Sequence, residues 1–152
     1  MGLFTRSRGY HRNNHVKLFS IITLIFSCSI FAQEIARTPA PEGARVYFIS
    51  PQDGATVGRE VVVIFGLEGM GVAPAGIDKE NTGHHHLLVD QAELPNLDQP
   101  LGNPPLHFGG GQTQTTLNLE PGTHTLQLIL GDKFHIPHQP PVLSEKITIT
   151  VK

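Results

Sequence analysis

The sequence has almost no cysteine, has no tryptophan, and contains no cluster of basic residues in its main part. Its single cysteine is Cys28, so residues 33–152 contain no thiol. That absence excludes a disulfide framework, a thiolate metal site and a cysteine nucleophile from this region. Neither a G-x-S-x-G elbow nor a phosphate-binding loop is present, so a serine hydrolase and a nucleotide-binding loop are not expected.

Charge is unevenly distributed along the 152 residues. All 13 acidic residues lie at or beyond Glu34, whereas four of the 11 basic residues precede it. The whole chain has a formal net charge of −2, but from residue 33 onward seven basic residues face 13 acidic ones, a net charge of −6. A region of this sign without a basic patch is not expected to bind nucleic acid.

The first 32 residues have the layout of a secretory signal peptide. Basic residues precede residues 18–30 (LFSIITLIFSCSI), an apolar run of 13 without charge, and Ala32 follows. Since a bilayer span takes about 20 residues, the run favours a cleaved signal over a membrane anchor. Cleavage after Ala32 is expected, with a lipoprotein cut before Cys28 as the alternative. The protein is therefore predicted to be periplasmic or extracellular, without stable membrane insertion after cleavage.

Residues 33–43 predict a proline-rich tether, and residues 44–152 predict one all-β domain. Six segments have strand character: 44–49, 60–66, 84–90, 112–119, 123–130 and 144–151. Strands this short, separated by Gly- and Pro-containing turns, are typical of an immunoglobulin-like antiparallel β-sandwich, here of six or seven strands. The tight turn at 120–122 predicts that 112–119 and 123–130 pair as a hairpin.

Seven of the nine histidines fall between residues 84 and 138. His84, His85 and His86 open a predicted strand, where alternation sends His84 and His86 to one face and His85 to the other. Residues i and i+2 of a strand are about 6.5–7 Å apart, a span that two imidazoles can close around one ion. The triplet therefore predicts two ligands on a single face.

Further histidines lie in two long loops. His107 precedes three glycines, and His135 and His138 flank the rigid Ile136-Pro137 pair. If these loops share one end of the sandwich, the predicted ligands are His84, His86, His107, His135 and His138. Asp90 and Asp132 are candidate carboxylates that either bind the metal directly or accept a hydrogen bond from a ring N–H. His124 shares a strand face with leucines and is expected to be a core or rim residue.

Imidazole ligands suit copper(II) or zinc, and the only thioether of residues 33–152 is Met70, which argues against copper(I). Two alternatives remain open. The histidines can form a structural or ligand-recognising cluster in an interaction module that binds a cell-envelope component. A metal-dependent enzyme is the third hypothesis, although no catalytic residue and no organic cofactor site is identified.

Four motifs resemble the bacterial secreted family known as domain of unknown function 4399. They are GHHHLLVD at 83–90, HFGGGQT at 107–113, THTLQL at 123–128, and LGD with HIPH over 130–138. The resemblance covers about residues 45–151. It implies a small exported bacterial domain, and it brings no assigned activity.

Overall fold

The structure is a computed structural model that describes residues 1–2 and 36–152. The predicted signal peptide therefore lies outside the described residues except for its first two, and Cys28 and both expected cleavage sites lie outside them as well. The described residues 36–152 belong to one compact unit. Within the described part of the chain no helix is long and apolar enough to cross a membrane.

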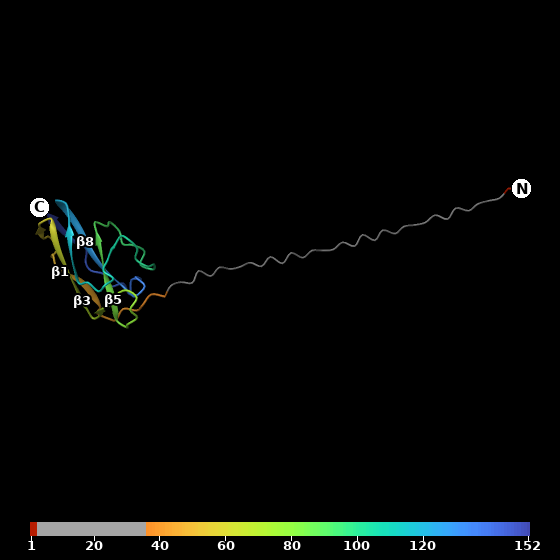
Figure 1. Ribbon diagram of the computed structural model, residues 1–152, viewed down its shortest axis with the longest axis horizontal. Helices are drawn as coiled ribbons and strands as arrows, with labels where there is room; N and C mark the ends of the chain where they lie inside the picture. Colours follow the sequence, from red (N-terminus) through yellow and green to blue (C-terminus); the bar gives the residue numbers. More distant parts are fainter. Residues whose placement is uncertain (3–35) are drawn as a thin grey trace. The chain divides into compact units, whose positions relative to one another are not determined.

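Two β-sheets build the domain (Figure 1). The first has the order β1-β3-β7 and is antiparallel, with β1 (Arg45–Ser50), β3 (Glu60–Glu68) and β7 (Gln114–Asn118). The second has the order β2-β9-β8-β5-β4, with β6 paired to β5. Its strands are β2 (Thr56–Val57), β4 (Gly71–Val72), β5 (Thr82–Val89), β6 (Leu106–His107), β8 (Gly122–Gly131) and β9 (Ile147–Val151). The predicted all-β sandwich is confirmed: the six predicted strands are present, and β2, β4 and β6 are additional two-residue strands.

The main core lies between the two sheets. Alternate residues of β3 (Val61, Val63, Phe65) are buried in one cluster with Leu126 and Leu128 of β8. This follows from the two-residue period of a strand, which points every second side chain toward the opposing sheet. Burying each such side chain contributes about 1.5–3 kcal/mol. β9 likewise alternates between buried and exposed residues.

The predicted hairpin between 112–119 and 123–130 is wrong. β7 pairs with β3 in one sheet, whereas β8 lies in the other sheet. A strand has only two hydrogen-bonding edges, and those of β8 are occupied by β5 and β9. The turn at residues 119–121 therefore crosses from one sheet to the other, and Leu117 faces β8 across the core instead of lying beside it.

Both faces of β5 are buried, and they differ in character. Leu87 belongs to the main core, and the ring of His85 lies 5.1 Å from that of Phe65 on the same inner side. On the outer side, Leu88 packs with Leu101 and Ile129 in a second cluster. Because the loops that follow β5 and β8 cover this outer side, the face carrying His84 and His86 is shielded from solvent.

Residues 36–43, which the sequence predicts to be a tether, are bound along the domain. Residues 38–40 form a short backbone ladder with Gln139. The Gln139 amide donates to the Thr38 carbonyl at 2.9 Å, and the Ala40 amide donates to the Gln139 carbonyl at 2.9 Å. This segment therefore contacts the loop that connects β8 to β9.

Candidate metal centre

Four histidines from three separate segments meet at one end of β5. They are His84, His86, His107 and His135, and each offers one ring nitrogen such that all four atoms lie within 4.8 Å of one another. His84 and His86 are fully buried, His135 is half-buried and His107 is exposed. The predicted convergence of strand and loop histidines is therefore found for four of the five residues.

The short strand β6 places His107 in the group. His107 pairs directly with His86 across the β5–β6 ladder, so the two side chains share one face. Their ring centres are 5.1 Å apart, and their planes are inclined by 29°. Gly109 leaves room for the His107 ring, since a Cβ at this position would overlap it. Gly109 thus has a steric role at the site.

Asp132 shapes the loop that presents His135. Its Oδ1 accepts hydrogen bonds from the amides of Phe134 at 2.8 Å and Ile136 at 3.0 Å, and its Oδ2 accepts one from the Thr38 hydroxyl at 2.6 Å. Between those two amides, His135 adopts a left-handed φ of 67°. A non-glycine residue seldom takes this conformation unless its surroundings impose it. Asp132 therefore supports the site through the backbone, and no hydrogen bond joins it to a histidine ring in the described structure.

Gly131 gives the His86 ring its space. It lies opposite His84 in the β5–β8 ladder. A Cβ on Gly131 would lie 2.8 Å from Cε1 of His86 and 3.3 Å from the Cα of His135. The absence of a side chain thus lets two of the four histidines approach the same backbone segment.

The ring nitrogens of His84 and His86 are buried without hydrogen-bond partners among the described residues. Buried polar groups in folded proteins are nearly always paired, and an unpaired one costs about 1–3 kcal/mol. His85 is also unpaired, but it is alone on the inner face against Phe65. On the outer face, by contrast, the unpaired nitrogens of His84 and His86 lie near other imidazoles. One cation bound there would give the lone pairs of several rings a partner.

Three of the four histidines have pKa values below the ordinary value for histidine. Burial, followed by the neighbouring His135 and His107, lowers the pKa of His84 to about 4, against an opposing effect of Asp132. Burial, followed by the other three histidines, lowers the pKa of His86 to about 3. The pKa of His135 is also lowered, first by burial and then by His107. Neutral imidazole is the form that binds metals, so His84, His86 and His135 are in a metal-binding protonation state at pH 7.

Two predicted site residues lie apart from this group. His138 is buried, but its ring nitrogens lie 3.4 Å from the Leu130 carbonyl and 3.2 Å from the Thr82 carbonyl. Asp90 follows the far end of β5, about 20 Å along the strand from His84. It pairs there with His124, whose Nδ1 is 2.7 Å from its Oδ2. His124 is thus a rim residue, as expected.

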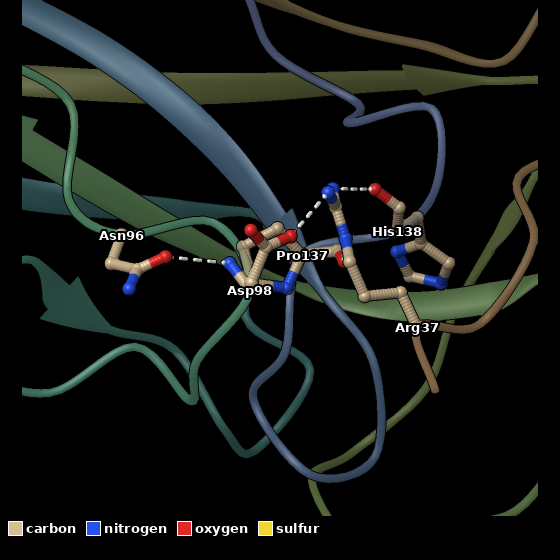
Figure 2. Close-up of polar contacts among 5 residues, drawn as sticks. All are labelled: Arg37, Asn96, Asp98, Pro137 and His138. Atoms are coloured by element: carbon tan, nitrogen blue, oxygen red, sulfur yellow. Dashed lines mark hydrogen bonds and ion pairs between the residues drawn. The ribbon is translucent and has the colours of Figure 1, made fainter. Parts of the chain in front are cut away.

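Arg37 and Thr38 support the site, although neither residue lies in a sequence motif that indicates this role. The Arg37 guanidinium donates to the carbonyls of Pro137, at 2.9 Å, and His138, and forms an ion pair with Asp98 at 3.1 Å (Figure 2). Figure 2 also shows the Asn96 side chain accepting the Asp98 amide at 3.0 Å. Arg37 therefore joins the loop after β5 to the loop after β8. Such contacts link positions about a hundred residues apart, so no local pattern could indicate them.

Comparison with known proteins gives one structural similarity. The endo-β-1,4-mannanase from Thermotoga petrophila superposes with a TM-score of 0.41 at 21% sequence identity, over 72% of this chain and 20% of that enzyme's chain. The protein thus spans about a fifth of the enzyme's length. No curated protein matches the sequence.

The family comparison covers the candidate metal centre. The family described as "Domain of unknown function (DUF4399)" matches residues 63–152, which begin within β3 and include all four clustered histidines. The match extends over more than half of the chain, and it agrees with the motifs around His84, His107 and His135. The protein belongs to the DUF4399 family.

Proposed function

We propose that the protein binds one divalent transition metal ion, copper(II) or zinc, through His84, His86, His107 and His135. The observation that carries the proposal is the meeting of four ring nitrogens within 4.8 Å, two of the rings being fully buried with no hydrogen-bond partner in the described structure. The donor set consists of imidazoles, which suit both ions. Binding would serve carriage, buffering or sensing of the metal.

The test is a titration of the protein purified without a polyhistidine tag and freed of metal with a chelator. Calorimetry with copper(II) and with zinc is expected to show one equivalent bound, with a dissociation constant below the micromolar range. The double variant His84→Ala/His86→Ala is expected to lose this binding. His85→Leu is the matched control, because His85 lies on the same strand but faces the core.

Weak binding without saturation, equal in the wild-type protein and the double variant, would contradict the proposal. The cluster would then be a structural one, consistent with an interaction module that recognises a cell-envelope component. Tight binding lost in His85→Leu as well as in the double variant would also count against it, since the loss would then reflect misfolding.

We further propose that the protein acts outside the cytoplasm, in the periplasm or the extracellular medium. The support is the basic segment and the apolar run over residues 18–30, followed by Ala32. Mass spectrometry of the exported protein is expected to give a mature chain that begins at Gln33. A lipid-modified chain beginning at Cys28 would favour the lipoprotein alternative, and an intact N-terminus in the cytoplasmic fraction would contradict export.

A further inference from the structure

The spatial arrangement of the four histidine rings distinguishes between the two candidate ions. Five of the six distances between ring centres fall between 4.7 and 5.1 Å, and the sixth, between His86 and His135, is 6.0 Å. Four points with these six separations cannot lie in one plane, because a planar arrangement would need a second long distance. The rings therefore surround a common centre in three dimensions.

The distances can be compared with two ideal coordination geometries. With metal–nitrogen bonds of about 2.0–2.1 Å, a tetrahedral ion places the ring centres about 5.2 Å apart in all six pairs. A square-planar ion with the same bonds gives four distances of about 4.5 Å and two of about 6.4 Å, the two long ones joining opposite rings. In that case His84 and His107 would be the second long pair, but their centres are 5.0 Å apart.

The surrounding backbone resists a rearrangement toward a plane. His84 and His86 are fixed on β5 and fully buried. The His86 ring packs against Gly131, and the His107 ring packs against Gly109. Neither ring can therefore move closer to the main chain at these glycines, which belong to or adjoin the paired strands β8 and β6.

We infer that the four histidines form a tetrahedral site whose geometry suits zinc. This inference rests on the proposed function and deepens it. Zinc has no geometric preference of its own and is found in tetrahedral sites, whereas copper(II) favours square-planar or tetragonal coordination. With four protein ligands, a tetrahedral ion has no open position for a reactive water, so the site is suited to hold zinc and not to activate a water on it.

Cobalt(II) is the spectroscopic probe for this geometry. Titrating the metal-free protein with cobalt chloride is expected to produce the intense visible bands of tetrahedral cobalt, and zinc chloride is expected to abolish them at one equivalent. Copper(II) held at the site is expected to give an electron paramagnetic resonance spectrum distorted away from the tetragonal type. His107→Ala is expected to shift the cobalt bands and to weaken zinc binding by at least about tenfold, since loss of even an outer-shell partner costs about 10–100-fold.

The outcomes separate the inference from the proposed function. If neither copper(II) nor zinc binds the wild-type protein, the proposed function fails. If both bind but cobalt gives the weak spectrum of a six-coordinate ion and copper(II) a tetragonal one, metal binding stands and the tetrahedral zinc site is overturned. His124→Gln, which lies at the far end of β5, is the control and is expected to leave the cobalt spectrum unchanged; an equal shift in this variant would also overturn the inference.

Discussion

His86 and His107 face each other across the β5–β6 ladder with their ring centres 5.1 Å apart, although 20 residues separate them in the chain. The pairing brings an exposed loop histidine next to a fully buried strand histidine. It connects the shielded interior of the group with the protein surface. Under the proposed function, a metal ion would enter from the side of His107, the exposed member of the group.

Gly131→Ala is expected to weaken metal binding without unfolding the domain. The new Cβ would lie 2.8 Å from Cε1 of His86 and would displace that ring from the group. We expect a loss of zinc affinity of about tenfold or more and a loss of stability of about 1–3 kcal/mol from overpacking. Calorimetry and urea unfolding measure the two effects.

Gly102→Ala is the matched control for this variant, because no heavy atom lies within 4 Å of the Cβ it would add. It is expected to match the wild-type protein in both measurements. Unchanged zinc affinity in Gly131→Ala would show that the His86 ring does not need this space.

Thr38→Val tests whether the segment before β1 supports the site. The substitution keeps the shape of the side chain but removes the hydroxyl that donates to Asp132 at 2.6 Å. Leaving a buried carboxylate oxygen unpaired is expected to cost about 1–3 kcal/mol of stability. Zinc affinity is expected to fall as well, because Asp132 holds the amides on either side of His135. Thr38→Ser retains the hydroxyl and is expected to restore both properties; equal defects in the two variants would argue for a packing role.

His85→Leu is expected to stabilise the protein and to leave metal binding intact. Both ring nitrogens of His85 are buried without a partner in the described structure, and the ring lies beside Phe65 in an apolar setting. An aliphatic side chain of similar size removes this desolvation cost, which is about 1–3 kcal/mol. A higher urea midpoint with unchanged zinc affinity is the expected result. A large destabilisation would show that the ring has a polar role on the inner face.

The metal-free protein is expected to lose stability in mild acid. Burial lowers the pKa of His84 and His85 to about 4 and that of His86 to about 3, while an unfolded histidine titrates near 6.5. The unfolded state therefore binds more protons than the folded state as the pH falls below about 6.5. Each of the three residues can contribute a slope of up to about 1.4 kcal/mol per pH unit between that value and its folded pKa.

Urea midpoints measured between pH 7.5 and 4.5 check this expectation. They are expected to be constant near pH 7.5 and to fall steeply below pH 6.5. In His85→Leu the fall is expected to be shallower, since one of the three buried histidines is gone. A midpoint independent of pH over this range would mean that the rings are not buried as described.

The strands of the domain could be recognised from local patterns, but their partners could not. All six predicted strands are present, because alternation of apolar residues and intervening Gly and Pro are local signals. β7 could pair only with a strand that had a free hydrogen-bonding edge. Because β5 and β9 occupy both edges of β8, β7 pairs with β3 instead. A tight turn such as that at residues 120–122 therefore does not show whether the chain stays in one sheet.

For the candidate site, the strand histidines could be predicted more fully than the loop histidines. The shared face of His84 and His86 follows from the two-residue period of β5. The choice between His135 and His138 depends on the loop conformation that Asp132 imposes and on contacts from Arg37 and Thr38. Residues that far apart in the chain leave no joint pattern in the sequence.

By itself, the sequence determined that residues 33–152 are β-rich, acidic and free of thiols, so any metal ligands had to be imidazole or carboxylate groups. It also determined that two of the clustered histidines share a strand face, because backbone geometry sets side-chain alternation within a strand. The tertiary structure alone decided which distant histidines join them. It brought in His107 through β6 and His135 through a left-handed loop residue, and left His138 and Asp90 outside. The reason is that ligand geometry depends on long-range pairing and close packing, which arise only when the two sheets and their loops assemble.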